Sequence, residues 1–226
     1  MIINKNVTKT YQMGEIDLKV IKNLNLSIEY GEFIAIVGPS GSGKSTVLNL
    51  LGCLDKPSEG KILIDGTDIT QLNRTQLADF RGENIGFIFQ SFNLIPVLSV
   101  YENIEYPLIM IQNLEQDERD KRIMQLLKEV DMLDQKDKFP DQLSGGQRQR
   151  VAIARALVTK PKIVFADEPT ANLDTETSNQ IITLMRNIQK EFNTTFVFAT
   201  HDEKIVTAVD RIITLVDGEI IDDKRV

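Results

Sequence analysis

The sequence is short of several residue types, and each shortage limits what the protein can be. Its 226 residues include one cysteine, Cys53, one histidine, His201, and no tryptophan. A single cysteine excludes an internal disulfide and is typical of a protein from a reducing compartment. The histidine follows the strand-forming run TTFVFAT. A lone histidine beside apolar residues is more often a packed residue at the edge of a core than a catalytic one, so other motifs must support any functional role.

Long apolar runs and an excess of basic residues are also missing. No stretch approaches the roughly 18 to 20 apolar residues needed to cross a bilayer, and the opening residues, MIINKNVTKTYQ, lack the basic start and apolar core of a signal peptide. Lysine and arginine number 26 against 33 acidic residues, a formal net charge of -7. This balance disfavours nucleic-acid binding. We therefore expect a cytoplasmic protein with no nucleic-acid partner, in which any association with a membrane comes through another protein.

What the chain does contain is an alternation of strand-like and helix-like segments. Short runs rich in β-branched residues and bounded by Gly, Asp or Pro predict buried strands. Helical patterns lie between several of them, including 43–54, which contains Cys53, and 175–192. Such alternation is typical of an α/β fold with a mainly parallel sheet. The strand-like runs lie at 33–38, 61–66, 85–90, 162–167, 194–200 and 211–221.

Residues from about 92 to 158 interrupt this alternation. Three helical patterns follow one another there, at 99–111, 117–130 and 145–158. The segment predicts a helical subdomain inserted into a single domain that spans residues 1–226.

Residues 38–46, GPSGSGKST, match the pattern G-x-x-x-x-G-K-[ST] between a predicted strand and a predicted helix. Glycines let backbone N–H groups turn inward around phosphate oxygens, and the start of a helix adds partial positive charge. Lys44 would reach the β- and γ-phosphates of a nucleotide, and Ser45 would ligate Mg²⁺. A flexible glycine-rich turn is the alternative, and the flanking strand and helix disfavour it. The predicted binding residues are Gly38, Pro39, Ser40, Gly41, Ser42, Gly43, Lys44, Ser45 and Thr46.

Two consecutive carboxylates end another predicted strand, in KIVFADEP at 162–169. Asp167 would hold the metal, typically through water, because Mg²⁺ keeps much of its hydration shell. Glu168 would lie on the opposite side of an extended chain and polarise the attacking water. Alone, such a pair is often only a polar loop. Beside a phosphate loop it favours nucleotide hydrolysis over simple binding.

The run LSGGQRQRVAIARAL, 143–157, is the most specific motif in the chain. Locally it is a second glycine-rich turn that opens a helix, so its backbone N–H groups and Ser144 predict a second anion site. LSGGQ is also the signature of the ATP-binding cassette family, the motor subunits of ABC transporters, which the chain resembles over essentially its whole length. The resemblance implies a P-loop NTPase (RecA-like) core with a mainly parallel sheet, an N-terminal antiparallel β region and the inserted helical subdomain.

The resemblance further implies a dimer of two identical cassettes. The two copies would pair head to tail and clamp ATP between the phosphate loop of one and the signature of the other, which two-fold symmetry makes into two composite sites. Asp174, in ANLD, would cross the dimer interface. The signature residues expected to bind the partner's ATP are Ser144, Gly145, Gly146 and Gln147.

The same resemblance implies roles for three scattered residues. Tyr11 would stack on the adenine, although an isolated tyrosine is otherwise a packing residue. Gln90 would sense both the metal with its water and the membrane partner. His201 would contact the γ-phosphate and help to align Glu168 with the water, so that Glu168, His201 and Gln90 form the catalytic set. The implied metal ligands are Ser45, Gln90 and Asp167.

Three stretches, 13–46, 48–60 and 85–108, most resemble the cassettes of macrolide-type exporters and lipoprotein-release complexes. The resemblance implies a separate integral membrane permease, docked near Gln90–Asn103, and a periplasmic adaptor that would act through the permease. Local support comes from apolar residues in an expected surface segment, which suit a docking groove unless they pack inside the helical subdomain. These residues are Phe92, Leu94, Ile95 and Leu98.

Other functions remain open at this stage. A regulatory cassette that signals through a permease-like partner in cell-envelope or division control would have nearly the same sequence, and the neighbouring reading frames would distinguish the two. A soluble cassette of DNA repair or translation predicts a long coiled-coil insertion or two tandem cassettes, and the sequence has neither. A P-loop kinase would not explain LSGGQ.

Overall fold

The computed structural model describes residues 1–14 and 16–226, and within them the strands form two sheets. An antiparallel sheet of four strands has the order β2-β1-β4-β5, and a six-stranded sheet has the order β10-β9-β3-β8-β7-β6. In the second sheet, β9, β3, β8, β7 and β6 run parallel and β10 pairs antiparallel to β9 at the edge. The bounds are β1 Ile2–Met13, β2 Ile16–Ile28, β3 Phe33–Val37, β4 Glu59–Ile64, β5 Thr67–Asp68, β6 Ile85–Ile88, β7 Ile163–Asp167, β8 Thr195–Ala199, β9 Arg211–Val216 and β10 Glu219–Arg225.

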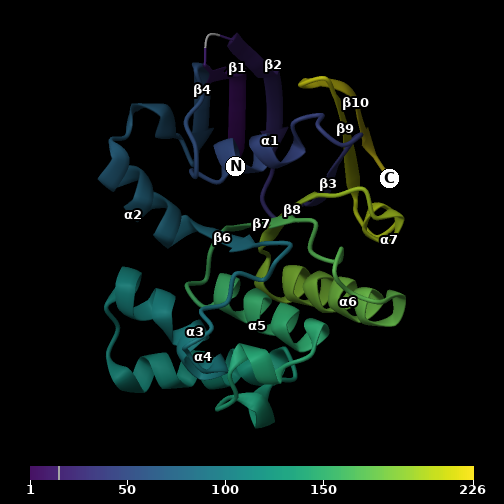
Figure 1. Cartoon of the computed structure of the whole chain (residues 1–226). Coiled ribbons are helices and arrows are strands. Elements are labelled where there is room, and N and C mark those ends of the chain that lie inside the picture. Colours follow the sequence, from purple (N-terminus) through teal and green to yellow (C-terminus); the bar gives the residue numbers. More distant parts are fainter. Residues whose placement is uncertain (15) are drawn as a thin grey trace.

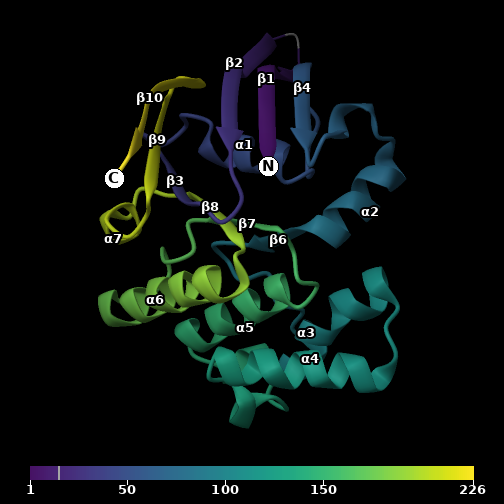
Figure 2. The same ribbon diagram turned by 180° about the vertical axis from the view of Figure 1, so that it is seen from behind.

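The parallel sheet is buried on both faces, and its strands are accordingly mostly apolar. Residues at alternate positions of a strand face opposite sides, so Ile34 and Ile36 pack in one core and Phe33 and Ala35 in the other. The first core contains α1, Lys44–Leu51, and the antiparallel sheet. The second contains the helices of the opposite layer. Figures 1 and 2 show α1 and the antiparallel sheet on one side of the parallel sheet and the larger helices on the other.

The helical layer carries most of the segment 92–158. A π-helical turn at Leu108–Gln112 directly follows α3, and α5 packs against both α3 and α6. The bounds of the remaining helices are α2 Arg74–Asn84, α3 Val100–Pro107, α4 Gln116–Glu129, α5 Gly145–Leu157, α6 Thr175–Phe192 and α7 Glu203–Val206. Helix α6 coincides with the predicted helix, and its apolar stripe is buried at Ile181, Ile182, Met185 and Ile188.

The structure corrects two sequence expectations about elements. The run 211–221 is a hairpin of two strands, β9 and β10, because Asp217 and Gly218 have φ of 48° and 80° and form its turn. Cys53 does not lie within a helix. Helix α1 ends at Leu51, and Cys53 follows in the left-handed region with φ of 58°. The Cys53 side chain is buried in the core that contains α1.

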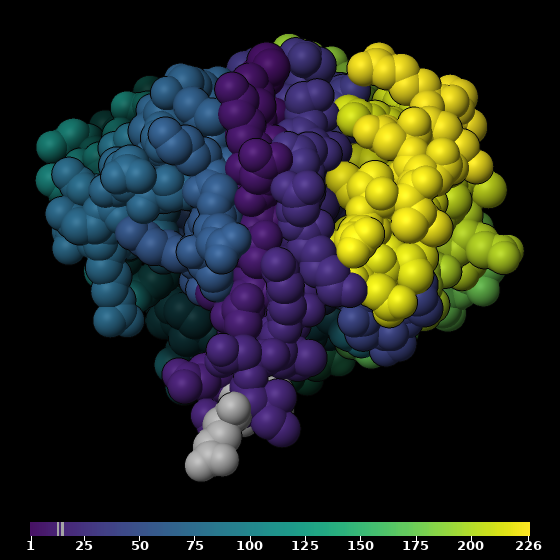
Figure 3. Space-filling model, turned by 90° about the horizontal axis from the view of Figure 1, so that it is seen from above, coloured from purple at the N-terminus to yellow at the C-terminus, as the bar shows by residue number. Residues whose placement is uncertain are grey.

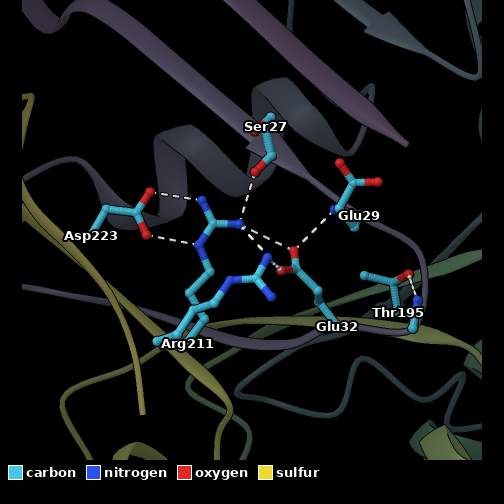
Figure 4. A network of polar contacts seen from close by, with 8 residues as sticks. Ser27, Glu29, Glu32, Thr195, Arg211 and Asp223 are labelled. Carbon is cyan, nitrogen blue, oxygen red and sulfur yellow. Dashed lines mark hydrogen bonds and ion pairs between the residues drawn. The ribbon is translucent and has the colours of Figure 1, made fainter.

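The C-terminal hairpin is fastened to the rest of the protein by a buried arginine, Arg211 (Figure 4). Its guanidinium donates two hydrogen bonds of 2.7 Å to Asp223 and one each to Ser27 O and the Glu32 carboxylate, at 2.9 and 3.1 Å. The network joins β9 and β10 to the antiparallel sheet. Figure 3 shows the result from above, with the N-terminal strands lying between the segment after α1 and the C-terminal hairpin.

None of the helices formed by residues 1–14 and 16–226 combines the length and the apolar character needed to cross a membrane.

Candidate active site

The phosphate loop joins β3 to α1 at the carboxyl edge of the parallel sheet. A Cβ atom on Gly38 would lie 2.0 Å from the Leu215 carbonyl oxygen, so only glycine fits against β9 at this position. Gly43, the residue before α1, has φ of 102°, and no side chain within the described residues caps the helix there. The first backbone N–H groups of α1 are therefore available to an anion.

Lys44 and Ser45 form the first turn of α1. The Lys44 ammonium donates to the carbonyl oxygens of Gly38 and Pro39 at 2.9 and 3.0 Å, which holds it along the loop. Ser45 Oγ donates to Asp167 Oδ1 at 3.0 Å. Asp167 ends β7, which is separated from β3 by β8 alone. The sheet thus brings a lysine, a hydroxyl and a carboxylate to one point from distant parts of the chain.

The donors at this point fit a magnesium ion. Ser45 Oγ and Asp167 Oδ1 are hard oxygen donors, the kind that Mg²⁺ binds, and Mg²⁺ commonly takes one or two protein ligands together with water and substrate phosphates. Within residues 1–14 and 16–226, no three His, Cys, Asp or Glu side chains form a cluster that could hold a metal ion by themselves. Burial raises the pKa of Asp167, the Ser45 hydrogen bond opposes this, and the adjacent Glu168 carboxylate raises the pKa further.

Glu168 does not continue the extended chain of β7, contrary to the sequence expectation. Its φ is 46°, and its backbone N–H donates to the Ala199 carbonyl oxygen at 2.9 Å, so the chain turns toward the end of β8. The carboxylate then meets the residues that follow β8. Thr200 Oγ1 donates to Glu168 Oε2 at 3.0 Å, and His201 Nδ1 lies 2.7 Å from Glu168 Oε1.

The environment of His201 rules out the core-histidine alternative. Its side chain is 76% exposed, whereas that of Glu168 is 16% exposed. The two lie together in an open hollow of about 430 Å³, also lined by Thr170 and Asp202. Because an ionised carboxylate can only accept hydrogen bonds, the proton in the short contact belongs to Nδ1 of the histidine. Because Nδ1 is the nitrogen that contacts Glu168, Nε2 is the ring nitrogen that this contact leaves free.

Sequence analysis missed the residues that support this pair. Thr200 Oγ1 accepts a hydrogen bond of 3.0 Å from the Asp202 backbone N–H while donating to Glu168. Thr170 Oγ1 in turn donates to Asp202 Oδ2 at 2.7 Å. A signal was present, since Thr200 and Asp202 directly flank the histidine in the sequence. No sequence signal pointed to Thr170, because its contact with Asp202 forms only when the loops after β7 and β8 come together.

Gln90 follows β6, the neighbour of β7, and lies exposed in a turn. Asn172 Nδ2 donates to its backbone oxygen at 2.8 Å, which connects the Gln90 turn to the loop before α6. The following residues are held by α5. Arg155 donates to the carbonyl oxygens of Asn93 and Phe92 at 2.5 and 2.8 Å.

This arrangement corrects the expected apolar surface after Gln90. Phe92 is 9% exposed, with the Arg148 guanidinium 5.2 Å from its ring centre, and Leu94 packs against the helical core. Ile95 and Leu98 are half-buried. The exposed apolar residue is instead Val97, at 76%. The proposed packing alternative therefore applies to Phe92 and Leu94.

The signature residues occupy a different place from the phosphate loop. Ser144 caps α5: its Oγ accepts from the Gln147 N–H at 3.2 Å, and Gln147 Oε1 accepts from the Ser144 N–H at 2.9 Å. A Cβ on Gly146 would lie 2.5 Å from Thr177 Cγ2, so this glycine allows α5 and α6 to start close together. Asp174 caps α6 and accepts hydrogen bonds of 2.9 and 2.6 Å from Thr177.

The predicted site residues thus form two groups. The first combines the loop 38–46 with Asp167, Glu168 and His201, and Tyr11 of β1 lies beside the first turn of α1, near Thr46. The second contains the start of α5 and Asp174. Helices α1 and α5 belong to the separate cores on opposite faces of the parallel sheet.

Known proteins share this combination of motifs and fold. The family model "ABC transporter" matches residues 21–171, which is more than half of the chain. The chain belongs to this family and is an ABC ATPase cassette, an α/β P-loop NTPase that binds ATP. The family resemblance and the fold class expected from the sequence are confirmed.

Particular relatives narrow the comparison. The chain is 49% identical over 226 residues to the uncharacterised ABC transporter ATP-binding protein MJ0796 of Methanocaldococcus jannaschii, with 97% of this chain and 95% of that protein covered. It is 47% identical over 214 residues to the lipoprotein-releasing system ATP-binding protein LolD of Colwellia psychrerythraea, covering 95% and 83%. It is 43% identical over 230 residues to the macrolide export ATP-binding/permease protein MacB of Rhodopirellula baltica, where it spans only 33% of the longer protein.

A solved structure agrees over the whole chain. The dimeric post-hydrolysis state of MJ0796 bound to ADP and Pi superposes with a TM-score of 0.92 at 47% identity, covering 100% of this chain and 98% of that one. That cassette therefore forms a dimer and binds the products of ATP hydrolysis.

Proposed function

We propose that this chain is the ATP-hydrolysing subunit of an ABC transporter that dimerises on ATP and thereby drives a separate membrane permease in export or extraction of a substrate. The relatives named for macrolide export and lipoprotein release support this class of partner. The chain would act as one domain, 1–226, with residues 92–158 as its helical subdomain. It would lie in the cytoplasm, peripheral at the membrane through the permease, and a periplasmic adaptor would reach it only through that permease.

The observation that carries the proposal is the contact of Glu168 with His201 beside the Ser45–Asp167 pair. Loop residues 38–46 and the free start of α1 would bind the phosphates of ATP, with Lys44 on the β- and γ-phosphates. Mg²⁺, held on the side of Ser45, Asp167 and Gln90, would neutralise charge on the phosphate oxygens. Glu168 would then accept a proton from the attacking water, since its carboxylate faces the hollow at the end of the sheet.

His201 would have two tasks that use its two nitrogens. Its Nδ1–H holds one oxygen of Glu168, while Thr200 holds the other, so the carboxylate is fixed for proton transfer. Its Nε2 would then contact the γ-phosphate, and it can donate a hydrogen bond there only when the ring is protonated.

The signature would act on the ATP of the second copy. Ser144, Gly145, Gly146 and Gln147 lie at the start of α5, in the core layer opposite to α1, so their place suits an incoming phosphate from another chain. Asp174 would contribute at the same interface. The Asn172–Gln90 hydrogen bond would connect this interface to the segment that we assign to the permease, near Gln90–Asn103. Val97 would carry apolar contact there.

Mixing two defective chains tests this arrangement. We expect Lys44→Ala and Ser144→Arg each to lose ATPase activity when alone, the first through phosphate binding and the second through blocking the signature. In a mixed dimer one composite site combines the intact phosphate loop of one chain with the intact signature of the other. Activity should therefore reappear on mixing, measured as phosphate release at fixed total protein.

The controls separate folding from function. Circular dichroism and thermal unfolding should show that both variants are folded, and adding more of either variant to itself should restore nothing. If mixing fails to restore activity although mixed dimers form on size exclusion with ATP, the signature acts within its own chain and the proposed dimer is wrong.

A further inference from the structure

Tyr11 is held by a charged pair that the ATPase chemistry does not use. Its hydroxyl donates to Asp55 Oδ2 at 2.8 Å, and the Lys9 ammonium donates to Asp55 Oδ1 at 2.7 Å. Lys9 also donates to the Lys56 carbonyl oxygen at 2.8 Å, and its side chain is only 11% exposed. We define Lys9, Tyr11 and Asp55 as the tyrosine clamp.

The clamp restricts the ring in two ways. The hydroxyl is tied to a carboxylate that is itself fixed by Lys9 and by the Lys56 backbone N–H, which donates to Oδ1 at 2.7 Å. In addition, the Lys9 ammonium lies 4.7 Å from the centre of the Tyr11 ring, within the range of a cation–π contact. One face of the ring is therefore covered, and only the opposite face can receive another planar group.

The position of Asp55 connects this ring to the phosphate loop. Helix α1 begins at Lys44, directly after the loop, and Asp55 follows the end of the same helix. After the helix the chain folds back, since the backbone N–H groups of Leu54 and Asp55 donate to the Asn49 carbonyl oxygen at 2.9 and 3.1 Å. Asp55 therefore lies beside α1, the helix that starts at the phosphate loop. The Thr46 hydroxyl on the first turn of α1 also lies near the Tyr11 hydroxyl and lowers the pKa of the phenol, against burial and Asp55, which raise it.

We propose that Asp55 and Lys9 are positioning residues for nucleotide binding, which hold the Tyr11 ring before ATP arrives so that its uncovered face stacks on the base. The inference rests on the proposed contact of Tyr11 with the base of ATP. Holding an aromatic side chain in its bound orientation lowers the entropy cost of binding. Lys9 and Asp55 themselves touch no part of the nucleotide.

The protonation states of Asp55 and Tyr11 keep the hydrogen bond between them intact. Burial raises the pKa of Asp55, but hydrogen bonds from Lys9, Tyr11 and the Lys56 backbone outweigh it and leave the pKa below its ordinary value. The Tyr11 pKa is raised, first by burial and then by Asp55. The carboxylate thus stays an acceptor and the phenol stays a donor across the neutral pH range.

The test compares a ligand that has a base with one that has none. Equilibrium dissociation constants are measured for ATP and for inorganic tripolyphosphate, both with Mg²⁺, on the isolated cassette. We expect Asp55→Ala and Tyr11→Phe each to weaken ATP binding about three- to ten-fold, because each variant frees the Tyr11 ring, which must then be immobilised when ATP binds. Tripolyphosphate binding should not change in either variant, and kcat at saturating ATP should not change in Asp55→Ala.

Further variants give the inference its specificity. Tyr11→Phe combined with Asp55→Ala should be no weaker than Asp55→Ala alone, because both break the same bond. Asp55→Asn keeps an acceptor for the Tyr11 hydroxyl and should recover part of the affinity. Lys22→Met removes an ammonium from an exposed pair, 4.0 Å from Glu219, and serves as a control that leaves both ligands unaffected.

Three results would overturn the proposal in different ways. If Asp55→Ala weakens tripolyphosphate as much as ATP, the residue only supports the fold. If Asp55→Ala and Tyr11→Phe leave ATP affinity intact while Tyr11→Ala reduces it, Tyr11 contacts the base without a clamp. No effect of Tyr11→Ala would instead remove the base contact itself and the inference with it. Tyr11→Phe leaves the Lys9–Asp55 pair in place, so it remains informative if Asp55→Ala does not fold.

Discussion

Two helices of this protein start after glycine-rich turns, α1 at Lys44 and α5 at Gly145, but the two starts are built differently. Before α1, Gly43 offers no side chain, and the loop glycines with positive φ leave the first N–H groups of the helix free. Before α5, Ser144 and Gln147 satisfy each other's backbone N–H groups in a capping box. The second glycine after this cap, Gly146, allows close packing on Thr177.

The difference shows which start is a complete anion site within one chain. The start of α1 has a lysine, a hydroxyl and a nearby carboxylate for a metal, whereas the start of α5 has only its cap and its helix dipole. A glycine-rich helix start is therefore not by itself evidence for a site. This difference supports the proposal that the first start binds the triphosphate within one chain and that the second contacts the ATP of another chain.

The largest effect should come from the chemistry beside α1. Glu168→Gln keeps the shape and the Thr200 contact of the side chain but removes the base, so we expect kcat to fall about 10²- to 10⁴-fold. ATP binding should persist, and an ATP-bound dimer should accumulate on size exclusion. Phosphate release under single-turnover conditions measures the change, and near-normal turnover would show that Glu168 is not the base.

A companion variant is His201→Ala, which removes the hydrogen-bond partner of Glu168 and leaves the carboxylate in place. Because the His201 side chain is 76% exposed, thermal stability should not change. Hydrolysis should fall far more than ATP affinity. Loss of stability and affinity with normal turnover would contradict the assignment.

The next effect directly contrasts the two helix starts. Lys44→Met should weaken ATP binding to the monomer about 10- to 100-fold, as loss of charged hydrogen bonds would. Ser144→Ala should cost about 1 kcal/mol of stability through loss of the helix cap, with monomer affinity for ATP unchanged and ATP-dependent dimerisation weakened. Titration of monomer with nucleotide, followed by sedimentation, separates the two. Equal loss of monomer affinity in both variants would mean that the starts are equivalent.

The smallest effect concerns the pH dependence of stability beside α1. Burial raises the pKa of Asp167 above 3.8 in the folded protein, so the folded state binds this proton more tightly than the unfolded chain. Its stabilising contribution is present below pH 3.8 and is lost as the pH rises through the folded pKa. Asp167→Asn removes this loss, and its nucleotide-free form should unfold at a slightly higher temperature than the wild type at neutral pH. A lower temperature across the whole range would show that the carboxylate stabilises the fold.

Much of the fold followed from local patterns. The strands at 33–37, 163–167 and 195–199 and the helix at 175–192 lie where the apolar runs and the helical periodicity predicted them. Apolar patterning alone did not separate β9 from β10, because the turn at Asp217 and Gly218 lies within one β-branched run. Sequence analysis did not predict helix α2, because its mean hydropathy is low and Leu77 is its only buried residue among those described.

The candidate site likewise contains residues that the sequence could indicate and features that it could not. The loop 38–46 and the pair Asp167 and Glu168 are contiguous, and their spacing is tied to backbone geometry, so a motif could indicate them. The burial of Phe92 was not predictable, because it depends on Arg148 and Arg155 from a helix more than fifty residues later. The left-handed turn at Glu168 was hidden as well, since it is made by the Ala199 carbonyl of the neighbouring strand.

The sequence by itself determined the family, the fold class and the candidate residues of the ATP site, because phosphate-binding motifs and apolar periodicity depend on neighbours along the chain. Tertiary structure alone decided how those residues are held. Tyr11 meets Asp55 across 44 positions, and Ser45 meets Asp167 across 122. Contacts over such separations arise only when the sheets and helices pack, since hydrogen bonds between distant residues are set by the register and layering of the elements that carry them.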